Sequence, residues 1–136
     1  RFNISLKEGV EMVLWALENG RGGEIFVPKI PSYRIVDVAE AIGPECKLDI
    51  IGIRPGEKIH EEMITASDSG STIDLGRYYA ILPSADGARH KIYQERFGAK
   101  RVPPGYAYDS GSNPHFLTVN ELRELIAAHV AGGVPA

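Results

Sequence analysis

The sequence predicts an α/β fold in which helices and strands alternate through the first half of the chain. Capping patterns precede two amphipathic segments, short runs rich in β-branched or aromatic residues lie between helical segments, and Gly or Pro ends most of them. The predicted order from the N-terminus is helix, strand, helix, strand, helix. That order is typical of a layered α/β arrangement.

The first helix is predicted from the capping-box pattern Ser5-Leu6-Lys7-Glu8, and Asn19-Gly20 stops it. Apolar residues recur on one face of this helix: Leu6, Val10, Val13, Leu14 and Leu17. Residues 21–23 form a turn, and residues 24–27 are predicted to be a strand that ends at Pro28.

Ser32 is the expected N-cap of a second helix, which Gly43-Pro44 terminates. Its inward residues are expected to be Ile35, Val38, Ala39 and Ile42. The apolar run 48–53 predicts a short buried strand, and residues 59–64 a short helix.

The second half has a weaker pattern. A small, polar run at 66–71 predicts a loop or mobile segment, and a capping box at Thr118-Val119-Asn120-Glu121 opens a last helix. The apolar residues of this helix are Val119, Leu122, Leu125, Ile126 and Val130. Between them we expect a strand at 77–82, a helix at 86–97, a basic Pro-rich connection at 99–105 and a strand at 106–108, and beyond them frayed residues at 132–136.

The composition predicts one soluble globular domain, residues 1–136, with 43% hydrophobic and 24% charged residues. A net charge of −3 gives no reason to expect nucleic acid or an anionic membrane as a partner. One cysteine, Cys46, excludes an internal disulfide and fits a reducing compartment, so we expect a cytoplasmic protein. Because the chain begins at Arg1 rather than Met, we expect it to be part of a longer polypeptide.

The run Ile53-Arg54-Pro55-Gly56-Glu57-Lys58 is the strongest candidate for a binding site. Pro55 fixes φ and Gly56 permits a sharp turn, which brings Glu57 beside Arg54. An Arg fork suits a phosphate, and a nearby carboxylate suits a pair of sugar hydroxyls. A surface turn with a solvated ion pair of little energetic weight is the alternative.

Other motifs of catalysis are missing from the sequence. It has no G-x-G-x-x-G, no phosphate loop, no Tyr followed by Lys four positions later, no H-E-x-x-H and no nucleophile elbow. We therefore expect no complete active site and no metal site. Arg1 could supply a second cation, and Lys29 and Tyr33 lie on a loop where open α/β sheets place ligands, although such loops are more often plain connections.

Three stretches resemble the C-terminal half of the UDP-N-acetylglucosamine 4,6-dehydratases, which are polysaccharide-biosynthesis enzymes of the extended short-chain dehydrogenase superfamily. They are residues 1–6, 23–32 and 51–61. Tyr78-Tyr79-Ala80-Ile81 and residues 116–122 resemble later segments of the same family. The match runs from Arg1 to about Ile126 and is specific over residues 1–65.

By this resemblance, Arg54 would contact the UDP diphosphate, Glu57 a ribose hydroxyl, and Arg1 the diphosphate again. The fold would be the C-terminal substrate-binding part of a Rossmann-type enzyme that lacks most of its nucleotide-binding sheet. Residues 1–28 would include the last helix and strand of the Rossmann part, orphaned from their neighbours, and residues 66–72 would be a flexible loop.

The resemblance also implies what the chain lacks: a half or separate subunit with the NADP site and the catalytic Tyr and Lys. The parent enzyme would oxidise C4 of UDP-N-acetylglucosamine, eliminate water across C5 and C6, and reduce C6. We expect this chain alone to bind no cofactor and to be inactive. A UDP-sugar 4-epimerase of the same superfamily, or a non-catalytic module that docks to a separate Rossmann subunit, are the alternatives. An unpaired strand edge at 24–27 predicts self-association.

Overall fold

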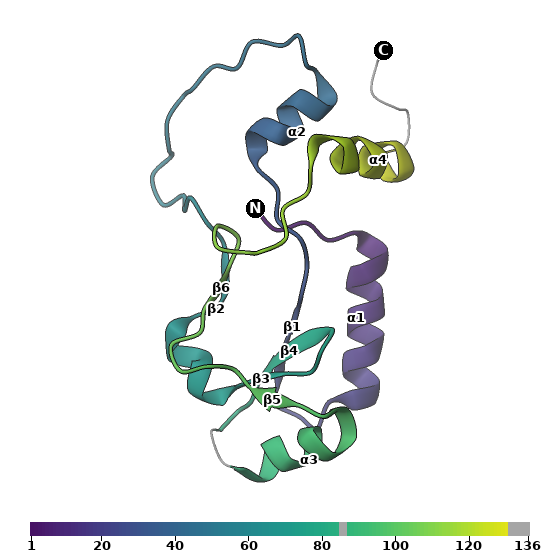
Figure 1. The fold of residues 1–136 in the computed structure, drawn as a ribbon, viewed down its shortest axis with the longest axis vertical. Helices are drawn as coiled ribbons and strands as arrows, with labels where there is room; N and C mark the ends of the chain where they lie inside the picture. Colours follow the sequence, from purple (N-terminus) through teal and green to yellow (C-terminus); the bar gives the residue numbers. More distant parts are fainter. Residues whose placement is uncertain (85–86, 131–136) are drawn as a thin grey trace. The chain divides into compact units, whose positions relative to one another are not determined.

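The computed structural model describes residues 1–84 and 87–130 (Figure 1). The chain divides into two compact units. Unit 1 comprises Arg1–Asn3, Pro31–Glu61 and Ser110–Ala136, and unit 2 comprises Ile4–Ile30 and Glu62–Asp109. The assignment of residues 1–136 to one domain stays a prediction. The fraying expected at 132–136 and a helix start at Asp86 lie outside the described residues.

Unit 2 contains most of the regular structure. Its elements are α1 (Leu6–Asn19), β1 (Ile25–Pro28), β2 (Glu62–Ile64), the 3-10 helix η1 (Ala66–Ser71), β3 (Thr72–Asp74), β4 (Tyr78–Ile81), α3 (Gly87–Phe97), β5 (Lys100–Arg101) and β6 (Tyr108–Asp109). Unit 1 contains α2 (Ile35–Ile42) and α4 (Val119–His129). The predicted mixture of helices and strands is confirmed.

A four-stranded sheet of unit 2 has the order β1-β4-β3-β5, and its strands pair antiparallel. The expectation that residues 24–27 have lost their neighbours is therefore wrong on one side, because Phe26 is in register with Ala80 of β4. The other edge of β1 has no partner strand among the described residues. β2 and β6 form a separate two-stranded sheet.

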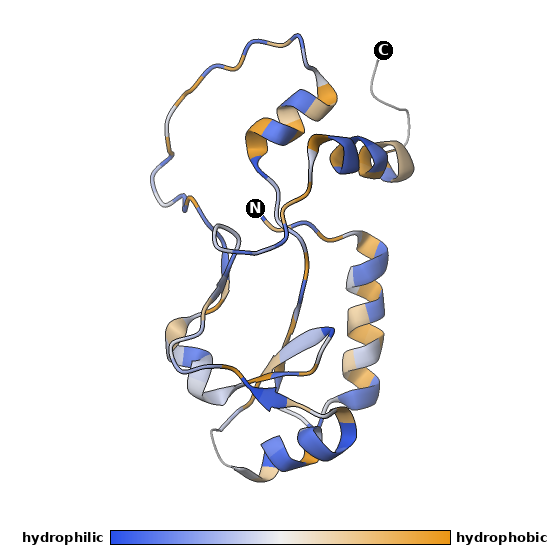
Figure 2. Cartoon of the chain, viewed as in Figure 1, coloured by the Kyte–Doolittle hydropathy of each residue, from blue (hydrophilic) through white to orange (hydrophobic). Residues whose placement is uncertain are grey.

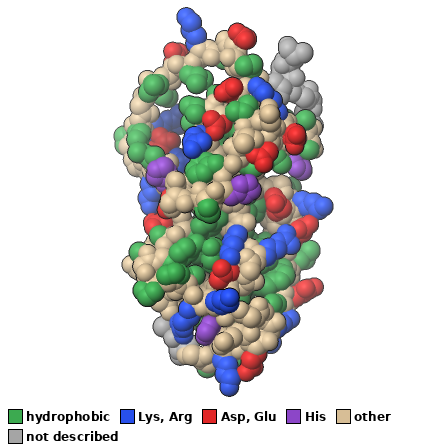
Figure 3. All heavy atoms as spheres, in the orientation of Figure 1, with side chains coloured by type: hydrophobic (Ala, Val, Ile, Leu, Met, Phe, Trp, Pro, Cys, Tyr) green, Lys and Arg blue, Asp and Glu red, His purple; other side chains and the backbone are tan. Residues whose placement is uncertain are grey.

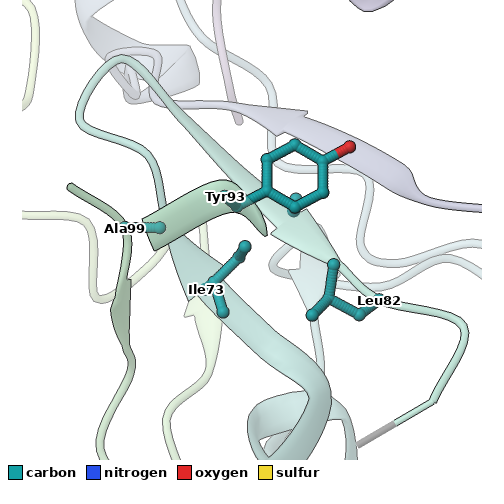
Figure 4. Packing of buried hydrophobic residues seen from close by; sticks show 5 residues of the cluster. Ile73, Leu82, Tyr93 and Ala99 are labelled. Carbon is teal, nitrogen blue, oxygen red and sulfur yellow. The ribbon is translucent and has the colours of Figure 1, made fainter. Parts of the chain in front are cut away.

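The core of unit 2 lies where α3 covers this sheet. Its buried residues are Ile73, Ala80, Leu82, Tyr93 and Ala99, and Figure 4 shows the Tyr93 ring near Ile73 and Leu82. Burial raises the pKa of Tyr93 to about 12. Its hydroxyl donates to the carbonyl of Asn19 at 3.3 Å, so the one polar atom of this ring has a partner.

Helix α1 begins and ends where the sequence predicts. Ser5 and Glu8 form the capping box, and Gly20 is the C-cap. The apolar stripe of the helix, however, faces solvent: Leu6 is 87% exposed and Leu17 77%. Hydrophobic residues recur along α1 in Figure 2, and hydrophobic side chains reach the molecular surface in Figure 3. Trp15 holds the helix instead, with ring centroids 4.7–5.6 Å from those of three aromatic residues: Phe26, Tyr78 and Phe97.

In unit 1, α2 and α4 pack together through a small cluster. Its buried residues are Ala41, Leu117 and Leu122, with Tyr33, Val38, Val119, Leu125 and Ile126 against them. The cap predicted for α2 is wrong, because Arg34 rather than Ser32 is the N-cap and makes no side-chain cap bond. Ile35 and Ile42, expected to be inward, are exposed.

Three further expectations are wrong. Residues 48–53 form no strand and are exposed, because nothing in the described residues pairs with them. Residues 62–64 are a strand rather than helix, since they pair with β6. The predicted loop at 66–71 is an ordered 3-10 helix, which a capping box of Thr65 and Asp68 opens. No helix in residues 1–84 and 87–130 has the length and apolar character needed to span a membrane.

Candidate functional site

Three separate segments of unit 1 meet at Ser32, which is fully buried. Ser32 forms an antiparallel bridge with Phe2 and a parallel bridge with Phe116. Its N–H donates to the carbonyl of His115 at 2.9 Å, and Asn113 Nδ2 donates to its hydroxyl at 3.0 Å. On either side of Ser32, the Asn3 N–H donates to the Pro31 carbonyl and the Tyr33 N–H donates to the Arg1 carbonyl, both at 2.8 Å. These two bonds fix the backbone from which the Arg1 side chain projects.

The Arg54-Pro55-Gly56-Glu57 run forms the turn that its sequence predicts. The Glu57 N–H donates to the Arg54 carbonyl at 3.0 Å, and Gly56 has φ +82°. Pro followed by a residue with positive φ is the pattern of a type II turn, which favours glycine at the second position. The Glu57 side chain folds back, so that the Arg54 N–H donates to its Oε2 at 3.1 Å.

The turn and the first residue of the chain come together in unit 1. Arg1 Nη2 lies 3.8 Å from Glu57 Oε1, and Arg1 Nε lies 3.9 Å from Glu61 Oε1. The Glu57 carboxylate therefore contacts both of the other predicted site residues: the backbone N–H of Arg54 and the guanidinium of Arg1. The structure thus brings Arg1 and Glu57 together, whereas the Arg54 guanidinium has no ion-pair or hydrogen-bond partner within residues 1–84 and 87–130.

This arrangement can bind an anion. The Arg54 guanidinium is exposed and can offer two parallel N–H donors. The contacts of Arg1 are long and half-exposed, and such ion pairs contribute only about 0–1 kcal/mol. A phosphate can therefore replace the contact between Arg1 and Glu57 at little cost. Each carboxylate oxygen of Glu57 keeps acceptor capacity for a hydroxyl.

Sequence reasoning missed Glu61 and its anchor. The Glu61 N–H donates to Ser110 Oγ at 2.9 Å, and the Ser110 N–H donates to the Glu61 carbonyl at 2.8 Å. It also missed the contact at Gly111: a Cβ there would lie 2.5 Å from Nδ1 of His60, so any other residue would displace the His60 ring from this position. Gly111 was visible in the sequence, but a lone glycine does not reveal that His60 packs against it.

Lys29 and Tyr33, the other candidates, do not join this group. Lys29 belongs to unit 2, where its Nζ lies 2.6 Å from Asp74 Oδ1 and 4.4 Å from the centroid of the Tyr79 ring. Burial, together with a hydrogen bond from Tyr106, raises the pKa of Tyr79. Tyr33 packs in the α2–α4 cluster. Within the described part of the chain, no group of His, Cys, Asp and Glu could hold a metal ion.

A protein family and several known proteins match this chain. A family model described as polysaccharide biosynthesis protein matches residues 1–83. The UDP-N-acetylglucosamine 4,6-dehydratase (inverting) of Campylobacter jejuni subsp. jejuni serotype O:2 is 45% identical over 130 residues, which cover 93% of this chain and 39% of that protein. A UDP-glucose 4-epimerase of Rickettsia canadensis is 39% identical over 132 residues, covering 93% and 38%.

The X-ray structure of Pen from Bacillus thuringiensis is similar in fold, with a TM-score of 0.74 and 28% identity. That match covers 94% of this chain and 38% of the other. The chain thus spans about two fifths of the length of the curated relatives it matches. The resemblance to the dehydratases and the α/β fold class are both confirmed. The chain belongs to the polysaccharide biosynthesis protein family.

Proposed function

We propose that this chain is the UDP-sugar-binding portion of a nucleotide-sugar 4,6-dehydratase that acts on UDP-N-acetylglucosamine. The observation that carries the proposal is the Arg54–Glu57 turn, in which the Glu57 carboxylate contacts Arg1 and the Arg54 guanidinium is left without a partner among the described residues. Arg54 grips the diphosphate through two parallel hydrogen bonds, and Arg1 adds a second positive charge. Glu57 accepts hydrogen bonds from a ribose hydroxyl.

The catalytic chemistry belongs to another part of the enzyme. The described residues do not fit a nicotinamide dinucleotide, because the four-stranded sheet is antiparallel and the sequence has no glycine-rich turn between a strand and a helix. The hydride step therefore belongs to residues outside this chain. This chain contributes binding and orientation of the substrate, and we expect no turnover from the 136 residues alone.

A UDP-sugar 4-epimerase portion is the second candidate, favoured by the similarity to the UDP-glucose 4-epimerase of Rickettsia canadensis. A grip on the nucleotide serves both reactions equally, because dehydration and epimerisation differ at the sugar ring. The higher identity to the Campylobacter dehydratase favours the first candidate.

Titration of the chain with UDP and with UDP-N-acetylglucosamine, followed by protein NMR, tests the proposal. We expect shifts of the amides of residues 53–58 and of residues 1–3. Arg54→Ala should abolish the shifts, and Arg54→Lys should recover only part of the affinity because an ammonium lacks the planar fork. Arg123→Ala is the matched control, since Arg123 is an exposed arginine of α4 in the same unit.

Equal binding by wild type, Arg54→Ala and Arg54→Lys would contradict the assignment of Arg54. Absence of any shift at millimolar ligand would contradict UDP-sugar binding by this chain. That result would favour the alternative in which the chain is a non-catalytic module that docks to a separate Rossmann subunit.

A further inference from the structure

Glu61 contacts the first two residues of the chain through both oxygens of its carboxylate. Oε2 accepts a hydrogen bond from the Phe2 N–H at 3.1 Å, and Oε1 lies 3.9 Å from Arg1 Nε. A carboxylate that holds a backbone N–H and faces a guanidinium fixes both the start of that side chain and its charged end. Glu61 therefore constrains where Arg1 can point.

The backbone of Glu61 is itself fixed. It exchanges two hydrogen bonds with Ser110, at 2.9 and 2.8 Å, and Ser110 is 1% exposed. The carboxylate thus projects from an anchored position rather than from a free loop. This distinguishes Glu61 from Glu57, whose backbone belongs to an exposed turn.

The two carboxylates share Arg1 but have different further partners. The second oxygen of Glu57 accepts from the backbone of Arg54 in its own turn, whereas the second oxygen of Glu61 accepts from Phe2, next to Arg1. When Glu57 turns to a ribose hydroxyl, it gives up its long contact with Arg1. Glu61 keeps its contact, because none of its bonds depends on the nucleotide.

We propose that Glu61 is a positioning residue that holds Arg1 toward the diphosphate of the bound nucleotide. This inference rests on the proposed function, and it adds a residue that acts through Arg1 rather than by touching the ligand. Its carboxylate is negative, so direct contact with a phosphate would oppose binding. Its effect on affinity must therefore disappear when Arg1 is removed.

A double-mutant cycle tests this dependence, with UDP as the ligand and NMR titration of the 136-residue chain as the readout. Glu61→Gln removes the charge but keeps an acceptor for the Phe2 N–H. We expect it to weaken UDP binding about two- to fivefold, the range of a partly exposed ion pair. In an Arg1→Ala background the same substitution should change nothing. Glu62→Gln, one residue along and exposed, is the matched control.

The Arg1 Nε–H resonance gives a second readout that a purely structural role would not move. Its chemical shift should change in Glu61→Gln. The amides of Ser32 and Leu117, which report the place where three segments of unit 1 meet, should keep their chemical shifts. An unchanged Arg1 resonance overturns the proposal, even where Arg1→Ala binds UDP too weakly to titrate. Tighter binding by Glu61→Gln, or an equal loss in both backgrounds, also overturns it.

The failure of the proposed function looks different. If wild type shows no UDP shifts, the UDP-sugar function and the role of Glu61 both fall. If wild type binds UDP through Arg54 and the cycle gives no coupling between Arg1 and Glu61, only the positioning role falls.

Discussion

Helices α1 and α4 have the same beginning and opposite surroundings. Each opens with a capping box in which the N3 glutamate accepts from the N-cap N–H at 2.8 Å. Each also carries an apolar stripe. The stripe of α4 packs on α2, with Leu122 5% exposed, whereas that of α1 faces solvent. Local sequence thus determines where a helix begins and which face is apolar. It does not determine whether another element covers that face.

The largest expected effect is on the buried stripe. Leu122→Ala should lower the free energy of unfolding of unit 1 by about 2–5 kcal/mol, because it leaves a cavity between α2 and α4. Leu14 of the α1 stripe is 57% exposed, so Leu14→Ala should change the free energy of unfolding by no more than about 0.5 kcal/mol. Denaturant unfolding followed at amides of α4 and α1 measures both. Equal losses would mean that the α1 stripe has a partner after all.

The exposed stripe should drive self-association. Unit 2 contains both an apolar helix face and an edge of β1 that pairs with no strand of residues 1–84 and 87–130, and both features favour contact with another chain. We expect sedimentation of wild type to depend on concentration, and a Leu14→Lys, Leu17→Lys double variant to sediment as a monomer. Glu18→Lys makes the same change in net charge on an exposed residue and should not dissociate the assembly. A wild type that is monomeric at high concentration would contradict this.

The smallest expected effect concerns the cap of α4. The N–H and hydroxyl of Thr118 hold the pKa of Glu121 below its ordinary value of 4.5. Because the folded pKa is the lower one, the cap stabilises α4 above the unfolded pKa and is lost as pH falls through the folded pKa. The protection of amides in the first turn of α4, measured as the exchange rate relative to the intrinsic rate at the same pH, should therefore fall in acid. Glu121→Gln should remove this acid dependence, and an unchanged pH profile would count against the cap.

The same division explains how much could be predicted from sequence. Helices α1 and α4 follow from their capping boxes and apolar periodicity, α3 and β4 from a weaker local pattern without caps, and the Arg54–Glu57 turn from Pro and Gly. The strand predicted at 48–53 failed because a β-rich run needs a partner, and none lies in the described residues. Strand β5, of two residues, pairs with β3, which lies more than twenty residues earlier in the chain, so no local pattern could predict it.

The site divides in the same way. Arg54 and Glu57 could be identified because they are neighbours in sequence, and Arg1 through a family resemblance. Glu61 could not, because its role depends on Phe2 and Ser110, which are far away along the chain. Contacts of this kind have no local pattern by which a single sequence could reveal them.

The meeting of three segments at Ser32 has a consequence for the order of folding. Its side-chain bond joins residues 81 positions apart, and closing so long a loop of unfolded chain is slow and entropically costly. Ile30 and Tyr108 of unit 2 exchange hydrogen bonds between the Ile30 backbone and the Tyr108 hydroxyl, at 2.9 and 3.0 Å, only a few residues away from Ser32 and Asn113. Once Ile30 and Tyr108 are paired, only a short loop has to close for Ser32 and Asn113 to meet. We therefore expect unit 1 to fold after unit 2, so that the contacts of Arg1 form late in refolding.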